Sequence, residues 1–299
     1  MKILLATDGS DGAFAATDFL MGLPLPAGTR VTLVTVLKAL LQEEEIARLA
    51  PERRGMYEQA RTDADAEARQ LLEDEAERLR SVGLAVETEI RTGHAAEEIV
   101  RLATEGQHRI IVVGSHGTHA PKNFLLGSVS DRVFEYAPCS VLIVRPASDE
   151  AVSDQQLRIL LAYDDSPPAR AATALCASLP LPTGTRFKAV TVLPLIHMFR
   201  QDVRQQLNWV WEEKKEAARR GLERVAAEVG QEGLEVTTEL VESSDVAQSI
   251  LDQASAFDSD LLVIGHKGKR RFERFLLGSV TARVAHHAPC SVLSVRECD

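Results

Sequence analysis

The chain has 299 residues, of which 45% are hydrophobic and 26% are charged, and its formal net charge at pH 7 is -10. This composition is typical of globular domains and excludes a disordered or collagen-like chain, and the length predicts two domains. No run approaches the roughly 18 apolar residues of a membrane span, and the acidic balance argues against a nucleic-acid partner. The N-terminus enters an apolar run without a signal-peptide pattern, so we expect a cytoplasmic protein without membrane contact.

The sequence contains two copies of one domain. Residues 23–37 match residues 179–193 at eleven of fifteen positions, and the hexapeptides FLLGSV (124–129) and APCSVL (137–142) recur unchanged at 275–280 and 288–293. The spacing predicts a tandem duplication, with a first domain over residues 1–147, a polar linker over 148–156 and a second domain over 157–299.

Strands and helices are expected to alternate within each copy. In the first copy the patterns predict strands at 3–7, 31–37, 85–91, 110–113 and 141–144, and helices at 13–20, 57–81, 95–104 and 128–136. The second copy repeats this order from residue 158 to 296. Strands separated by helices of ten or more residues need crossover connections, so we expect parallel sheets with helices on both faces. Ligands of such sheets bind at the carboxyl ends of the strands.

A glycine motif follows the fourth predicted strand of each copy. It has the spacing Gly-x2-Gly-x9-Gly-Ser, running from Gly114 to Ser128 and from Gly265 to Ser279. The arrangement strand, glycine loop, helix N-terminus lets backbone N–H groups approach a phosphate. We expect Ser128 and Ser279 at the N-cap positions of the following helices.

Asp8 and Asp164 end the first predicted strand of each copy. Such a carboxylate either accepts hydrogen bonds from a ligand or caps the following helix, and position alone favours capping. Val36 and Val192 end the second strands, where a valine is either an apolar wall for a base or an ordinary core residue.

These motifs together resemble the universal stress protein family in its tandem-domain form. The resemblance rests on the glycine motif after an apolar strand, the aspartate at the end of the first strand and the APCSVL segment, and it covers both halves of the chain. It implies two flavodoxin-like or Rossmann-like domains, each with a five-stranded parallel sheet. It also implies ATP as ligand, with or without Mg²⁺, and pairing of the two domains through their last strands (141–144 and 292–295). A homodimer is a separate expectation.

The family's ligand residues carry over by position. In the first copy, adenine and ribose would contact Ala6, Asp8 and Val36, the ribose and phosphate loop would use Gly114 and Gly117, and the phosphates would bind at Gly127, Ser128, Val129 and Ser130. The matching set in the second copy is Ala162, Asp164, Val192, Gly265, Gly268, Gly278, Ser279, Val280 and Thr281.

The two predicted sites differ in charge. The second loop carries Lys267, Lys269, Arg270 and Arg271, which favour a triphosphate, but Asp165 replaces the small Gly9 and adds a negative charge beside Asp164. We expect both sites to be competent, and the second to bind more tightly if Asp165 points to solvent.

Known catalytic motifs are missing from the sequence, including a Gly-x4-Gly-Lys-Ser/Thr phosphate loop and a Gly-x-Ser-x-Gly elbow. We therefore expect no catalytic residue and no metal site, and a stress-response or signalling module that acts through nucleotide-dependent conformation and an unknown protein partner. Two alternatives stay open: a nucleotide-independent interaction protein with vestigial sites, and a slow ATPase or nucleotidyl-transfer enzyme of related fold.

Overall fold

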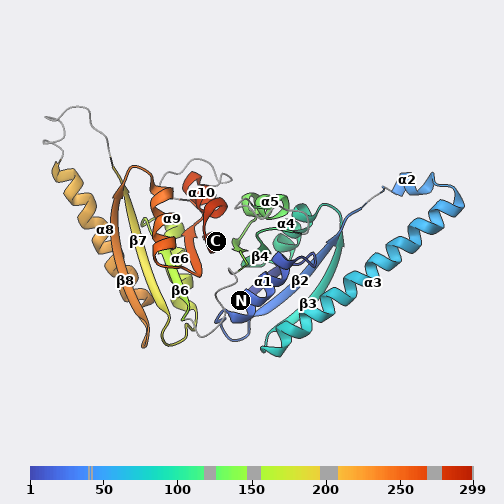
Figure 1. Cartoon of the computed structure of the whole chain (residues 1–299), viewed down its shortest axis with the longest axis horizontal. Helices are drawn as coiled ribbons and strands as arrows, with labels where there is room; N and C mark the ends of the chain where they lie inside the picture. The colour runs from blue at the N-terminus through green and yellow to red at the C-terminus, as the bar shows by residue number, and fades with distance from the viewer. Residues whose placement is uncertain are drawn as a thin grey trace. The chain divides into compact units, whose positions relative to one another are not determined.

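The computed structural model describes residues 1–39, 41, 43–117, 126–146, 156–195, 208–267 and 278–297. The chain forms two compact units, the first mainly from residues 1–146 and the second mainly from residues 147–299 (Figure 1). Most of the predicted linker lies outside the described residues, so the exact domain boundaries stay a prediction.

The first unit alternates strands and helices around one parallel sheet. Its elements are β1 (Lys2–Ala6), α1 (Asp11–Gly22), β2 (Arg30–Leu37), α2 (Glu43–Ala47), α3 (Pro51–Ser81), β3 (Ala85–Thr92), α4 (Ala95–Glu105), β4 (Ile110–Gly114), α5 (Ser128–Tyr136) and β5 (Ser140–Val144). The strands follow the order β3-β2-β1-β4-β5, and Ile3 of β1 lies opposite Val31 on one side and Ile110 on the other. Successive strands are therefore added toward β3 on one side of β1 and toward β5 on the other side, and the reversal lies between β1 and β4.

Helices cover both faces of this sheet. Helix α1 packs on β4 and β5 and touches α3, which covers β2 and β3, whereas α4 packs against α5 and the other face of β2. Right-handed crossovers produce this division, because connections that run in opposite directions along a sheet place their helices on opposite faces. The central strands β1 and β4 are consequently buried on both faces, which explains their uninterrupted apolar runs.

Helix α3 is longer than the pattern predicts. It starts at Pro51, six residues before the expected start, and none of its residues before Ala68 is buried. Proline suits the first turn of a helix, where its missing N–H has no acceptor to lose. The exposed half has no apolar stripe against a core, so hydrophobic periodicity could not mark it.

The second unit repeats this arrangement. Its described elements are β6 (Arg158–Ala162), α6 (Pro167–Ser178), β7 (Arg186–Pro194), α8 (Asn208–Val229), β8 (Glu235–Ser243), α9 (Val246–Ala256), β9 (Leu261–Gly265), α10 (Ser279–His287) and β10 (Ser291–Val295). All four strand pairs within the unit are parallel, in the order β8-β7-β6-β9-β10. The predicted α/β class, with parallel sheets and helices on both faces, is confirmed.

Candidate functional site

The turn between β1 and α1 is built around Asp8 and Ser10. Ser10 is the N-cap of α1 and its hydroxyl accepts the N–H of Ala13 at 3.2 Å, while Asp8 Oδ1 accepts the N–H of Ser10 at 3.1 Å. The prediction that Asp8 caps the helix is therefore wrong, because Ser10 takes that position and Asp8 closes the turn before it. Gly9 lies between them with a φ of 72°, a left-handed conformation that suits glycine.

Glycines bring the loop after β4 against this turn. A Cβ atom on Gly114 would lie 2.4 Å from the carbonyl oxygen of Gly12, and one on Gly117 would lie 2.6 Å from Asp8 Oδ2. A Cβ on Gly12 would lie 2.2 Å from the carbonyl oxygen of His116. Gly12 lies outside the glycine motif, although it is as tightly packed as the motif glycines.

The start of α5 faces the same edge of the sheet. Gly127, not Ser128, is the N-cap, no described side chain caps the helix, and its first intrahelical bond joins Asp131 N to Gly127 O at 2.9 Å. The expected N-cap role of Ser128 is wrong by one residue. The N–H groups of the first three helical residues, 128–130, have no intrahelical acceptor, which is the general property of helix starts.

The hydroxyl of Ser130 belongs to the interior. It is buried and donates to the carbonyl oxygen of Gly114 at 2.6 Å, which fixes α5 on the end of β4. The side chain of Ser130 is therefore buried, whereas the side chains of Ser128 and Val129 are exposed.

The remaining predicted residues of the first copy lie on neighbouring strands. Ala6 is the last residue of β1, Val36 is the penultimate residue of β2, and both side chains are only partly buried. Because β2, β1 and β4 are adjacent and parallel, the structure brings Ala6, Asp8, Val36 and Gly114 to one edge of the sheet.

The second unit repeats this geometry with the equivalent residues. Ser166 caps α6, Asp164 Oδ1 accepts the N–H of Ser166 at 3.0 Å, and Thr281 Oγ1 donates to the carbonyl oxygen of Gly265 at 2.8 Å. Gly278 is the N-cap of α10, so Ser279 is its first helical residue, and neither Asp164 nor Ser279 has the predicted capping role. Ala162 ends β6, and Val192 lies near the end of β7. Gly268 lies outside the described residues.

The main difference between the units is at Asp165, which has a φ of 60° where the first unit has Gly9. Its Oδ1 accepts the hydroxyl of Tyr163 at 2.8 Å and Arg170 Nη1 at 3.2 Å, and it lies 3.3 Å from Arg224 Nη2 of α8. Burial alone would raise the pKa of Asp165, but the hydrogen bonds from Tyr163 and Arg170 outweigh it and the pKa is lowered. The carboxylate is therefore held by these partners, while 40% of its side chain stays exposed to solvent.

His266 and Lys267 stand where the first unit has Ser115 and His116. His266 is buried beside Ser294, with 3.1 Å between Nδ1 and the hydroxyl, and burial together with Arg296 and Lys267 lowers its pKa to about 3. His266 is thus neutral at physiological pH, and Lys267 is the cation among the described residues of this loop, whereas Lys269, Arg270 and Arg271 lie outside them.

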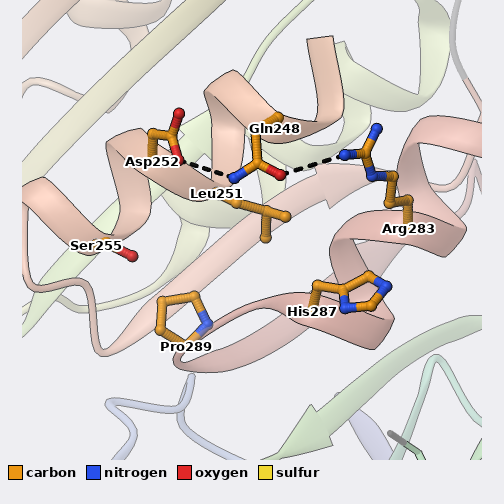
Figure 2. Close-up of a pocket in the computed structure, with 7 residues that line it drawn as sticks. All are labelled: Gln248, Leu251, Asp252, Ser255, Arg283, His287 and Pro289. Carbon is orange, nitrogen blue, oxygen red and sulfur yellow. Dashed lines mark hydrogen bonds between the residues drawn. The ribbon is translucent and has the colours of Figure 1, made fainter. Parts of the chain in front are cut away.

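Described residues of the second unit line two cavities of different size. The larger, about 410 Å³, lies between α9 and α10, away from the predicted residues, and its polar side chains bond to one another: Gln248 donates to Asp252 and accepts from Arg283 (Figure 2). The smaller, about 50 Å³, lies at the predicted site, and it is lined by Tyr163, Asp164, Asp165, Thr191, Ala217, Ala218 and Gly221. The smaller cavity is therefore the one that lies beside the predicted site residues at the carboxyl ends of the strands. None of the described helices is long and apolar enough to cross a membrane.

The family model for universal stress proteins matches residues 1–145 and again residues 157–296. This chain belongs to the universal stress protein family. The double match confirms the tandem form that the repeated motifs predict.

Individual relatives agree with the family assignment. A universal stress protein of Mycolicibacterium smegmatis is 32% identical over 215 residues, which cover 72% of this chain and 70% of that protein. Universal stress protein YxiE of Bacillus subtilis is 31% identical over 145 residues, or 48% of this chain and 98% of that protein. The crystal structure of a universal stress protein from Archaeoglobus fulgidus aligns over all of this chain and 97% of its own, with a TM-score of 0.63 and 21% identity, and supports the fold.

Proposed function

We propose that this universal stress protein binds ATP at the carboxyl edge of each sheet and acts as a stress-response module through nucleotide-dependent conformation and partner binding. One observation carries the proposal. In both units a helix without a side-chain cap starts directly beside a glycine loop and a turn that holds an aspartate. Backbone N–H groups and the positive end of the helix dipole suit the phosphates of a nucleotide.

The phosphate contacts come from the backbone. In the first unit the N–H groups of Ser128, Val129 and Ser130 hold the phosphates, because the Ser130 hydroxyl is already bonded to Gly114 O. A negatively charged protein can hold ATP in this way, since fixed backbone dipoles act locally whatever the net charge. In the second unit Ser279, Val280 and Thr281 act in the same way beside Gly278, and Lys267 adds a cation.

The nucleoside contacts come from the strand ends. Asp8 keeps Oδ2 beside Gly117, at a distance that leaves no room for a Cβ, so Asp8 and the glycines Gly114 and Gly117 form one surface for ribose. Ala6 and Val36 supply apolar contacts for adenine. In the second unit Ala162, Asp164, Val192, Gly265 and Gly268 take these roles.

Signalling follows from a change in the populations of two protein conformations when ATP binds. Bound ATP shifts an equilibrium only by the difference between its affinities for two conformations, so a partner must distinguish these conformations. Pairing of the two domains through their last strands, each domain with a five-stranded sheet, and a homodimer of the whole chain belong to the same proposal.

Single-site variants test ATP binding. A Cβ at Gly127 would have its nearest contact at 3.5 Å, which is ordinary packing, so Gly127→Val keeps the fold and places a side chain over the phosphate site. Gly278→Val is the counterpart in the second unit, where the nearest contact, to the backbone carbonyl oxygen of His266, is tighter at 3.3 Å, so the unfolding temperature of this variant without ATP is measured first. Titration calorimetry with Mg-ATP should give two sites in the wild type, one in each variant and none in the double variant.

Thermal unfolding supplies an independent readout. At 100 times its Kd, ATP should add about 2.7 kcal/mol to the unit that binds it. If ATP changes neither heat nor unfolding temperature, the sites are vestigial and the interaction-protein alternative replaces this proposal. Release of ADP or pyrophosphate during the titration would instead favour the enzyme alternative.

A further inference from the structure

The two copies differ by coordinated exchanges beside the proposed site. Leu71 of α3 and Gly221 of α8 each lie twelve residues before a Gly-Leu-x-Val segment, at Gly83 and Gly233. In the first unit a Cβ on Gly9 would lie 3.3 Å from a Leu71 methyl, so Leu71 occupies the space beside the turn. In the second unit the helix has Gly221 there instead.

The aromatic ring of Tyr163 uses part of the space that Gly221 leaves. A Cβ on Gly221 would lie 3.1 Å from Tyr163 Cε1, and the first unit has Thr7 at the position of Tyr163. The exchange of Thr and Leu for Tyr and Gly does not fill the second unit completely. It leaves the cavity of about 50 Å³, which has room for about three water molecules or one small polar group.

The wall of this cavity carries a fixed acceptor. The hydroxyl of Tyr163 and the guanidinium groups of Arg170 and Arg224 all reach Asp165 Oδ1. Within the described part of the chain, Oδ2 of Asp165 accepts no hydrogen bond. Because Arg170 also donates to the backbone carbonyl oxygen of Asp165 at 2.6 Å, the backbone of this residue is held as well. The carboxylate is therefore oriented before any ligand arrives.

The chemistry of the wall selects the kind of group that can enter. Asp164 and Asp165 both line the cavity, and carboxylates accept hydrogen bonds but do not donate them. The two arginines do not line it, so an anionic group would face the carboxylates. A hydroxyl or an amino group is the small polar group that fits.

We propose that the second site contains a subsite for a hydrogen-bond donor of the nucleoside, formed by Asp165 and positioned by Tyr163, and that the first site lacks it. The inference rests on the proposed ATP binding. The donor is either a ribose hydroxyl or the exocyclic amine of the base. In the first unit Gly9 offers no acceptor, and Leu71 presents methyl groups instead.

The test measures nucleotide selectivity at each site alone. Gly127→Val leaves the second site and Gly278→Val leaves the first, and each is titrated by calorimetry with ATP, ITP, 2′-deoxy-ATP and 3′-deoxy-ATP. ITP has an oxygen in place of the amine, and the deoxy compounds lack one hydroxyl. Asp8 and Asp164 contact the ribose at both sites, so the comparison is between the sites: we expect the affinity of at least one analogue, relative to ATP, to be about tenfold lower at the second site than at the first, since one hydrogen bond to a charged group is worth about 1.5 kcal/mol or more.

Asp165→Gly is the matched variant. It copies Gly9 and tolerates the left-handed backbone, so it removes the acceptor without strain. In the Gly127→Val background it should reduce the discrimination to that of the first site. The pair Tyr163→Thr with Gly221→Leu, which copies Thr7 and Leu71, should do the same by filling the cavity.

Equal losses for all three analogues at both sites would overturn the inference while leaving ATP binding intact. Discrimination that survives Asp165→Gly would overturn it too. Absence of ATP binding at both sites would instead refute the proposed function, and the subsite with it.

Discussion

Two effects of opposite sign act on the stability of the first domain when Gly12 is replaced by alanine. Alanine in a helix is favoured over glycine by about 0.5–1 kcal/mol, so helix propensity alone predicts a more stable first domain. The structure predicts the reverse, because a Cβ at Gly12 would lie 2.2 Å from the carbonyl oxygen of His116, a backbone atom that cannot rotate away. Overpacking of this kind costs about 1–3 kcal/mol, so we expect a net loss of about 1–2 kcal/mol.

Scanning calorimetry of the full chain measures this loss. For a domain of about 150 residues each kcal/mol shifts Tm by roughly 2–4 °C, so one transition should fall by about 2–8 °C. Gly22→Ala is the control within the same helix, since a Cβ there would have no atom within 4 Å, and it should not lower Tm. The shift of the glycine loop should also weaken ATP binding at the first site only.

The second unit has a wider contact at the equivalent place. Pro168 stands at the position of Gly12, and a Cβ on Gly265 would lie 3.0 Å from Pro168 and Ala169, compared with 2.4 Å for Gly114 and Gly12. The loop of the second unit therefore leaves more room. If Gly12→Ala leaves Tm unchanged or raises it, the first loop can move outward in the same way, and the close approach is not a constraint.

Three further predictions concern buried groups. Ser130→Ala should lower the stability of the first domain by about 1 kcal/mol in urea unfolding, because it leaves the carbonyl oxygen of Gly114 without its donor, whereas Ser128→Ala, at an exposed hydroxyl, should have no effect. His266 has a pKa of about 3 when folded and about 6.5 when unfolded, so the unfolded state binds more protons between these values. The contribution of neutral His266 to stability is therefore complete above pH 6.5 and is lost as the pH falls. Between pH 6 and 4 the unfolding free energy of the wild type should fall more steeply than that of His266→Ser, by up to about 1.4 kcal/mol per pH unit. Parallel curves for the two proteins would contradict the lowered pKa of His266. Burial raises the pKa of Cys176 to about 12, so mass spectrometry should find it unmodified by iodoacetamide in the native protein and alkylated in urea, and rapid native labelling would show that the site opens.

The fold was predictable because its strongest signals are local. The apolar runs of β1 and β4 exist because both faces of these strands are buried, and the repeated segments fix the duplication. Helix caps were less accessible to sequence reasoning. Asp8 and Ser10 are both good capping residues, and only the backbone geometry decides that Ser10 caps α1 while Asp8 closes the turn.

The candidate site was predictable in position but not in detail. The sequence places Asp165 beside Asp164, but its partner Arg224 is 59 residues away, and no periodicity links the two. Comparison of the two copies position by position carries the missing signal, since Thr7, Gly9 and Leu71 of the first copy are replaced together by Tyr163, Asp165 and Gly221 in the second. The glycine motif identifies the site residues that both copies share, whereas the side-chain contacts around Asp165 identify the difference between the two sites.

Helix α3 has a consequence for local dynamics. Its 31 residues span about 46 Å at 1.5 Å per residue, and its exposed half is held by contacts along the helix itself, such as Gln59 with Asp63 and Arg69 with Asp65. Pairs of this type contribute only about 0.2–0.5 kcal/mol each and weaken with salt when they are ionic. The first turns of α3 should therefore exchange their amide hydrogens almost like a free peptide, whereas the turns beyond Ala68 exchange with the domain.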